Sequence, residues 1–346
     1  MRFDTSEVRS RHSSPSAGAD RIIAVTGASG FVGRALVARL MADRRPVRAI
    51  VRRVRPEDGG SAWRVAVGDV GADTRWDAAL AGVDTVVHLA ARVHLLNDCA
   101  VDPLAEYRRV NVEGTRGLAL ACVRSGVRRL VLVSTVKVHG ETTRGRPFTE
   151  GDQPAPADPY GVSKMEAEEA LHSVARHSPL EAVVIRPPLV YGPGVGANFL
   201  ALMRAVDRGL PLPLGVVDNR RSLVYVKNLV DALVRCVDHA AAAGHTFLVD
   251  DGVPVSTAVL AREIARAFHA PCRLLPIPVS WLRFAGVLTG RRAAIARLLS
   301  DLEVDSGSFR RTVGWTAPWT LAQGLTETTA WYLGAAGSRR APHVYR

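Results

Sequence analysis

Lysine is the scarcest charged residue in this chain of 346 residues. Of its 45 basic residues only Lys137, Lys164 and Lys227 are lysines, which leaves 42 arginines. The net charge is +12, but the arginines are spread along the chain without the basic clusters and interleaved aromatic residues of a nucleic-acid surface. We therefore expect no nucleic-acid partner, and we attribute part of the charge to arginine-lined sites for phosphorylated small molecules.

Cysteine is also scarce, and long apolar runs are missing. The four cysteines have no metal-ligand spacing, so we expect reduced, packed thiols and no metal site; they are Cys99, Cys122, Cys236 and Cys272. No apolar run reaches the ~18 residues that a membrane helix needs. The longest candidate, 279–290, contains Arg283 and is predicted to be a buried helix. The first twenty residues lack the apolar segment of a secretory signal, which predicts a disordered tail and a cytoplasmic protein without a membrane partner.

Short apolar, β-branched runs alternate with helix-compatible segments over the first half of the chain. Continuous apolar strands between helices indicate a parallel sheet that is covered on both faces. The predicted fold is therefore α/β, a doubly wound, Rossmann-like parallel sheet. Strands are expected at 21–27, 47–51, 63–69, 84–90, 129–135 and 181–187, and helices at 30–43, 103–125 and 159–176.

The alternation ends near residue 187, where proline and glycine become frequent. We expect a smaller C-terminal substrate-binding lobe at the carboxyl edge of the sheet, where open α/β sheets bind ligands. The predicted division is a tail (1–20), the Rossmann domain (21–190), an interleaved lobe (191–335) and a second tail (336–346). Elements of about 222–250 are expected to return to the Rossmann domain.

The segment VTGASGFVGRAL (25–36) places three glycines between the first strand and the first helix. Glycine permits positive φ and close backbone approach, and a helix N-terminus presents free N–H groups to a pyrophosphate. The pattern predicts a dinucleotide site. Its expected contacts are Gly27, Ser29, Gly30, Phe31, Val32 and Gly33, followed by Val70, Leu89, Ala90, Ala91 and Pro187.

The end of the second strand bears on which dinucleotide binds. An acidic residue there would accept a hydrogen bond from the 2′-hydroxyl of NAD, but this chain has Arg52 and Arg53. Their forked donors suit a 2′-phosphate, so NADP is the expected cofactor and NAD the alternative. Asp69, at the end of the third strand, is expected at the adenine edge.

Tyr160 and Lys164 are four residues apart in a predicted helix, which places both side chains on one face. A nearby cation favours the phenolate and lowers the tyrosine pKa from its usual ~10. A lysine retained in an arginine-rich chain marks a position that the wider guanidinium fits badly. A strand that ends in Ser134 and Thr135 supplies hydroxyls for a substrate oxygen.

These motifs together resemble the extended short-chain dehydrogenases/reductases, and more narrowly their sugar-nucleotide epimerase, dehydratase and reductase group. The resemblance covers about residues 21 to 333 and rests on TGASGFVG, VVHLAA, NVEGT, VSTVKVHG, YGVSK and RPPLVYGPG in that order. It implies a catalytic triad of Thr135, Tyr160 and Lys164, which also makes Tyr160 and Lys164 cofactor contacts. It further implies sugar-nucleotide contacts at Asn198 and Arg221, the latter at the diphosphate, and a homodimer formed through helices that include 103–125 and 159–176.

Departures from the family pattern bear on the reaction. Sugar 4,6-dehydratases follow the catalytic threonine with an Asp-Glu pair, but Val136 and Lys137 stand here. Dehydration is therefore not expected. The stretches STVKVHGE, RPPLVYGPGVGANF, GLPLPLG and NRRSLVYVKNLVDA resemble a bacterial subgroup that acts at C4 of UDP-N-acetylhexosamines, and this resemblance implies reduction of the C4 keto group of a UDP-4-keto-6-deoxy-N-acetylhexosamine for surface polysaccharide. The alternatives are a UDP-sugar 4-epimerase with bound NAD, acting on UDP-glucose or UDP-N-acetylglucosamine, and a non-catalytic NADP-binding regulator. Ser134 is expected to contact substrate, whereas Lys137 either assists at the sugar or points to solvent.

Overall fold

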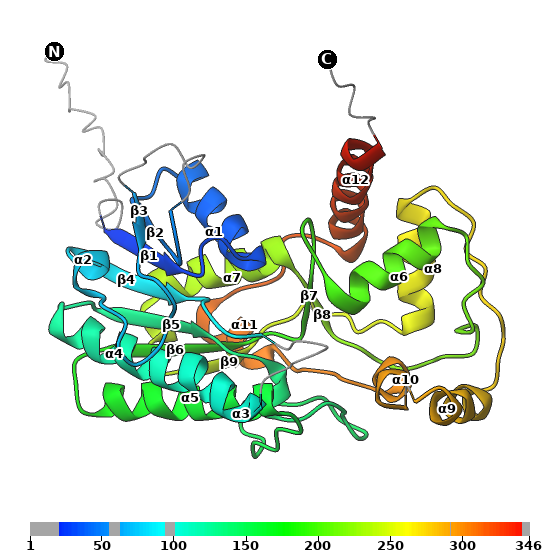
Figure 1. The fold of residues 1–346 in the computed structure, drawn as a ribbon, viewed down its shortest axis with the longest axis horizontal. Coiled ribbons are helices and arrows are strands. Elements are labelled where there is room, and N and C mark those ends of the chain that lie inside the picture. Colours follow the sequence, from blue (N-terminus) through cyan, green and yellow to red (C-terminus); the bar gives the residue numbers. More distant parts are fainter. Residues whose placement is uncertain (1–20, 55–62, 94–100, 291, 341–346) are drawn as a thin grey trace, which may run out of the picture.

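A central sheet of seven parallel strands organises the molecule. The computed structural model describes residues 21–54, 63–93, 101–290 and 292–340; the predicted N-terminal tail and Cys99 lie outside them. The strand order is β3-β2-β1-β4-β5-β6-β9 (Figure 1), which confirms the predicted doubly wound α/β fold. The strands are β1 (Ile22–Thr26), β2 (Val47–Val51), β3 (Arg64–Ala66), β4 (Val83–His88), β5 (Arg129–Val133), β6 (Glu181–Arg186) and β9 (Thr246–Leu248).

Helices cover both faces of this sheet, as a continuously apolar parallel sheet requires. One hydrophobic core lies beneath α1 (Phe31–Ala42), α7 (Val226–Asp238) and α11 (Gly307–Val313). The other lies beneath α2 (Asp77–Leu80), α4 (Gly114–Arg124) and α5 (Pro159–Arg176). The predicted helix 103–125 consists of α3 (Pro103–Tyr107), a π-helical turn (Arg108–Glu113) and α4 in direct succession.

The lobe beyond β6 is built around the short parallel pair β7 (Leu189–Tyr191) and β8 (Leu223–Tyr225). Its core includes Tyr191 and Phe199, whose rings stack with centroids 5.4 Å apart. The lobe helices are α6 (Ala197–Asp207), α8 (Thr257–Ala267), α9 (Val279–Leu288), α10 (Arg292–Leu299) and α12 (Leu321–Arg340). Single 3₁₀ turns occur at Val136–Val138 and Ala240–Ala242.

The chain crosses between sheet and lobe more than once. Within 222–250, α7 and β9 join the large sheet, whereas β8 pairs with β7 instead. The chain returns again at α11, where Phe309 and Val313 are buried in the sheet core beside β9. The predicted division placed α11 in the lobe. A seven-residue segment that opens with glycine carries little periodic signal, so its contact with the sheet core could not be predicted.

The predicted buried helix 279–290 forms as α9, but the expectation of burial is wrong. Leu282 is buried, whereas Trp281, Phe284, Val287 and Leu288 are 68%, 61%, 59% and 70% exposed. An apolar run does not say how many faces of its helix will be covered. Figure 1 shows α9 at the end of the lobe remote from the large sheet, where few elements remain to cover it. Among the described residues, no helix has the length and apolar character that would let it cross a membrane.

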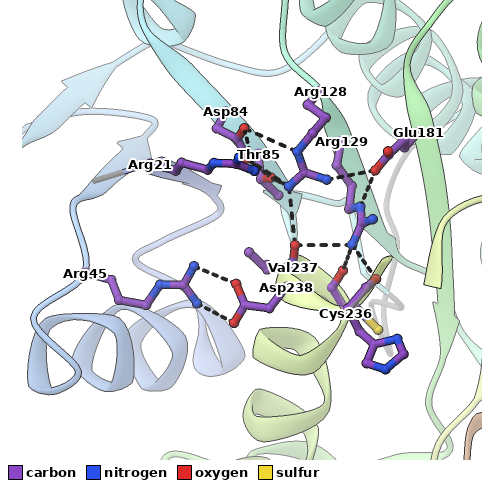
Figure 2. Close-up of polar contacts among 11 residues, drawn as sticks. Arg21, Arg45, Asp84, Thr85, Arg128, Arg129, Glu181, Cys236, Val237 and Asp238 are labelled. Carbon is purple, nitrogen blue, oxygen red and sulfur yellow. Dashed lines mark hydrogen bonds and ion pairs between the residues drawn. The ribbon is translucent and has the colours of Figure 1, made fainter. Parts of the chain in front are cut away.

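A buried arginine joins strands and helix at the amino edge of the sheet (Figure 2). The side chain of Arg129 is 1% exposed and donates from Nε to Glu181 at 2.7 Å. Its Nη1 donates to the carbonyls of Cys236, Val237 and His239, at the C-terminus of α7. These are carbonyls that a helix end leaves without intrahelical partners. Arg129 therefore fixes where α7 ends against β5 and β6.

Replacing Arg129 by methionine should lower the free energy of unfolding by about 3 kcal/mol, because buried helix carbonyls lose their donor. The matched control is Arg128→Met. Arg128 pairs with Asp84 and Glu181 but is 32% exposed, so its loss should cost about 1 kcal/mol or less. Urea denaturation of the three proteins measures both values. Equal losses for the two variants would contradict this role of Arg129.

Candidate active site

The turn between β1 and α1 is shaped as the glycine pattern predicts. Gly27 has φ +64°, and a Cβ there would lie 2.7 Å from the backbone nitrogen of Ala90. A Cβ on Gly33 would lie 2.2 Å from the Gly27 carbonyl oxygen. Gly30 caps α1 without a side-chain hydrogen bond, and Ser29 and Gly30 are exposed. The first N–H groups of α1 therefore face an open turn, which fits a pyrophosphate.

The end of β4 is fixed by a buried hydrogen-bond chain. Thr26 Oγ1 accepts from the backbone nitrogens of Leu89 and Ala90, both at 3.1 Å. Its own hydrogen is therefore directed to His88 Nδ1 at 2.6 Å, which leaves Nε2–H to donate to Thr115 Oγ1 at 3.2 Å. Burial, with a contribution from the charge of Lys164, lowers the pKa of His88 to about 3. His88 is thus a neutral residue that holds the backbone expected to contact the cofactor.

Two predicted cofactor residues contact each other at the opposite end of that site. Arg52 Nε lies 2.8 Å from Asp69 Oδ1, and the two side chains are 73% and 69% exposed. Arg53 is also exposed, whereas Val70, just beyond Asp69, is half-buried. The pairing brings the residue expected at a 2′-phosphate to the residue expected at the adenine.

The helix that carries Tyr160 begins at a well-formed cap. Asp158 Oδ1 accepts from the Gly161 nitrogen at 2.7 Å, and Pro159 occupies the first helical position. The other oxygen of Asp158 pairs with Lys137 Nζ at 2.5 Å, and Lys137 also pairs with Glu141 at 2.9 Å. Lys137 therefore does not point to solvent. It ties the segment after Thr135 to the start of α5.

Asn111 fixes the same helical turn from the other side. Its Oδ1 accepts from the Arg92 nitrogen at 2.8 Å, and its Nδ2 donates to the Arg92 carbonyl at 3.0 Å and to Ser163 Oγ at 2.9 Å. Ser163 in turn donates to the Tyr160 carbonyl at 2.8 Å. Asn111 lies in the π-helical turn and is 1% exposed, so it links the end of β4 to the first turn of α5.

Burial dominates the protonation of Tyr160 and Lys164. It lowers the pKa of Lys164, which is 2% exposed, to about 8, with Glu168 acting in the opposite direction. It also raises the pKa of Tyr160 above its ordinary value, and the nearby Asp158 carboxylate raises it further. The expected lowering of the Tyr160 pKa by Lys164 is therefore wrong for the protein alone, because desolvation of the phenolate and the neighbouring Asp158 and Tyr107 all raise this pKa.

A buried ion pair that the sequence analysis missed joins this helix to β6. Arg186 donates to Glu168, one turn beyond Lys164, and its Nη1 lies 2.8 Å from His139 Nε2. Arg186 and Glu168 are 9% and 4% exposed. Burial, then the Arg186 charge, lowers the pKa of His139 to about 4. The only signal in the sequence was an acidic residue on an otherwise buried helical face.

Ser134 and Thr135 follow β5 at the carboxyl edge of the sheet. Ser134 is 4% exposed, and its Oγ has no hydrogen-bond partner within the described part of the chain. A buried hydroxyl without a partner costs free energy, so this position fits a bound polar group. Thr135 Oγ1 accepts from the Lys137 nitrogen at 3.3 Å, and the Pro187 carbonyl accepts from the Val136 nitrogen at 3.0 Å.

The two predicted sugar-nucleotide residues lie in the lobe. Asn198 is exposed in the first turn of α6, after a glycine cap that makes no side-chain hydrogen bond. Arg221 is half-buried, and its Nη1 donates to the carbonyls of Arg297 at 2.8 Å and Ser300 at 3.0 Å. Burial lowers its pKa. Tyr191 and Phe199, which are 0% and 3% exposed, belong to the lobe core.

A parallel sheet of this order with a glycine turn before its first helix is typical of the nucleotide-binding α/β enzymes, and α5, which carries Tyr160 and Lys164, contacts the turn that follows Thr135. Residues 23–249 match the NAD dependent epimerase/dehydratase family, and the chain belongs to that family.

Individual relatives lie within the same class. The chain is 44% identical over 316 residues to a UDP-glucose 4-epimerase of Vibrio cholerae, covering 90% of this chain and 96% of that protein. It is 29% identical over 324 residues to the N-acetyl-α-D-glucosaminyl-diphospho-ditrans,octacis-undecaprenol 4-epimerase of Escherichia coli O157:H7, covering 88% and 93%. Among solved structures, MoeE5 in complex with UDP-glucuronic acid and NAD matches with a TM-score of 0.72 and 28% identity, covering 90% and 99%.

The depressed pKa of Lys164 predicts a pH-dependent gain of stability in Lys164→Met. Below about pH 8 the lysine is charged in both the folded and unfolded states, so the wild type bears the full cost of burying the cation. Above its unfolded pKa of ~10.4 it is neutral in both states and the cost disappears. Nucleotide-free Lys164→Met should therefore be more stable than wild type by up to about 3 kcal/mol at pH 7, and this gain should shrink between pH 8 and 10.5.

Urea titrations at several pH values measure this difference. Lys227→Met is the control, because Lys227 is 44% exposed and paired with Glu327. Its effect should be small and nearly constant over the same pH range. A Lys164→Met difference that grows with pH would refute the assignment.

Proposed function

We propose that this chain is a UDP-sugar 4-epimerase that works with NAD. The 44% identity to the Vibrio cholerae UDP-glucose 4-epimerase over nearly the whole of both chains carries the proposal. Two further features support the proposal: Tyr160 and Lys164 lie on one helix, and Thr135 lies just after a strand end. Of the activities weighed from the sequence, the relatives favour epimerisation over reduction of a 4-keto sugar.

The residues at the glycine turn fit a dinucleotide, and the adenosine end favours NAD. The free N–H groups of α1 would hold the pyrophosphate, and Lys164 would hold the nicotinamide ribose. A 2′-phosphate would have to compete with Asp69 for the guanidinium of Arg52, since the two are already paired. NAD, when bound, would supply a reversible hydride acceptor for the carbon at C4 of the sugar. NADP remains the second candidate because Arg53 is exposed nearby.

The side chains around the reacting carbon would handle a proton at the C4 oxygen. Tyr160 would take the C4 hydroxyl proton and later return it, with Lys164 supplying the positive charge that favours the phenolate. Thr135 Oγ1 already accepts a backbone hydrogen bond, so its own hydrogen is available to the C4 oxygen. The Lys137–Asp158 pair and Asn111 would hold the first turn of α5, and therefore Tyr160, in place.

The sugar nucleotide would be bound from the lobe. Arg221 uses one terminal nitrogen for the carbonyls of Arg297 and Ser300, and the rest of its fork would serve the diphosphate. Asn198 would contribute an amide at the open start of α6. Ser134, whose hydroxyl lacks a partner in the described structure, would contact the sugar or the nicotinamide.

The decisive experiment combines cofactor content with turnover. Protein purified without added nucleotide should release close to one NAD per chain on denaturation, and should interconvert UDP-glucose or UDP-N-acetylglucosamine with its C4 epimer without added cofactor. Tyr160→Phe should retain NAD and lose roughly 100-fold or more in kcat. Tyr332→Phe, whose hydroxyl bonds Asp207 on the exposed surface of the lobe, is the control and should retain activity.

The competing activity has its own signature in the same assays. Little bound nucleotide, together with NADPH oxidation that depends on a UDP-4-keto-6-deoxy-N-acetylhexosamine, would replace the epimerase by the reductase.

We also propose that two chains associate through α4 and α5. An open groove of about 860 Å³ lies along these helices, and its lining combines apolar side chains such as Leu120 and Val123 with charged ones such as Arg116 and Glu169. Leu120 is exposed, and the Arg108–Glu166 ion pair borders the groove. Sedimentation should give a dimer that Leu120→Arg dissociates and Val253→Arg, in an exposed lobe loop, leaves intact. A monomeric wild-type protein would refute this arrangement.

A further inference from the structure

The exposed side of α9 is an apolar surface that nothing in the described structure covers. Trp281, Phe284 and Leu288 lie at helical spacings of three and four residues, so they share one face, with Val287 beside them. All four are between 59% and 70% exposed. The opposite side of the helix packs into the lobe through Leu282, against Leu214 and Val217. Soluble monomers seldom expose so many large apolar side chains together without a partner.

The chain segment that contains this helix carries charge of one sign. From residue 264 to residue 300 the chain contains six arginines and no aspartate or glutamate. Arg283 lies within α9 and is exposed, as are Arg273 before the helix and Arg292 after it. The apolar face therefore belongs to a segment whose charged side chains are all cations, with no acidic side chain in the same segment to neutralise them. A partner for this surface has to combine an apolar interior with a negatively charged rim.

We propose that α9 docks this protein on an anionic lipid bilayer. The helix has ten residues, too few to cross a bilayer, and would lie in the plane of the interface. Trp281, Phe284 and Leu288 would enter the boundary between headgroups and acyl chains, while Arg283 and its neighbours would contact lipid phosphates. A second copy of this chain is a poor occupant, because two surfaces of the same positive charge repel each other.

The docking helix is connected to the candidate site through one neighbour. A Cβ on Gly286 of α9 would lie 2.9 Å from Ile295 Cδ1 of α10, so the two helices pack closely. The carboxyl end of α10 in turn supplies the carbonyl of Arg297 to Arg221. The exposed face of α9 itself carries none of the proposed catalytic or binding residues. Membrane docking would therefore place the proposed diphosphate end of the site near the bilayer without altering its chemistry.

Vesicle binding of the full chain tests the proposal. Phosphatidylcholine vesicles with about 30% phosphatidylglycerol should bind the wild type at low salt, and pure phosphatidylcholine vesicles should bind it much less. The double variant Trp281→Ser, Phe284→Ser should lose at least tenfold in the partition constant. Arg283→Gln with Arg292→Gln should lose a comparable factor, at roughly 1 kcal/mol for each arginine near the surface.

The matched control is Val253→Ser, which removes a 73% exposed apolar side chain outside α9 and should bind as the wild type does. Because the α9 changes replace exposed groups, circular dichroism and UDP-sugar turnover should stay at the wild-type level. Equal binding of wild type and double variant, or equal binding to neutral and anionic vesicles, would overturn the proposal. So would an α9 variant that changes the sedimentation mass, since that result assigns the surface to a second copy. Failure of the proposed epimerase activity alone would leave the vesicle result unchanged.

Discussion

In a parallel sheet that is buried on both faces, polar side chains on the strands cannot form hydrogen bonds with water and need partners within the protein. Much of this structure supplies those partners. His88 on β4 is held between two threonine hydroxyls. Arg129 on β5 is enclosed by a carboxylate and the carbonyl end of α7. Arg186 on β6 meets Glu168 and His139. Each of these partners comes from a different element. The hydrogen bonds of the strand side chain therefore also fix the position of the neighbouring element.

The two edges of the sheet satisfy their polar groups differently. At the amino edge, Arg128 and Arg129 donate to carboxylates and carbonyls, while the ring Nδ1 of the adjoining His239 is buried without a partner in the described structure. At the carboxyl edge the first turn of α1 keeps open N–H groups, and the Ser134 hydroxyl has no partner within the described residues. The open N–H groups and the Ser134 hydroxyl thus stand where the strands end, which is the edge at which open α/β sheets bind ligands.

Most of the architecture could be predicted from the sequence, because local signals and the fold agree. Strand and helix positions in the first 190 residues follow from β-branched runs and glycine or proline punctuation, and the spacing of Tyr160 and Lys164 required only helical geometry. What could not be predicted depends on neighbours distant in sequence. Lys137 finds Asp158 only after the chain folds back, and the pKa of Tyr160 rises because the surrounding structure removes water.

The lobe was harder to anticipate for the same reason. The apolar run of α9 has the composition of a buried helix, and only its place at the end of the lobe leaves Trp281 and Phe284 exposed. Likewise, α11 is too short for its sequence to predict that the chain returns to the sheet there. The relatives, rather than any motif, favour epimerisation over reduction, because both reactions would use the same three side chains.

The scarcity of lysine gives this protein an unusual chemical selectivity. Its three lysine amines differ sharply in access: Lys227 is 44% exposed, Lys137 is held between two carboxylates, and Lys164 is 2% exposed. Because its pKa is about 8, Lys164 has a substantial uncharged, nucleophilic fraction near neutral pH, unlike an ordinary surface lysine. Acylating reagents will find few lysines on such a chain, and if Lys164 holds the nicotinamide ribose as proposed, bound nucleotide would protect it by filling the cleft. The rate at which Lys164 is modified thus reports whether the cleft is empty. A lysine-rich surface would add a background of other modified amines to that measurement.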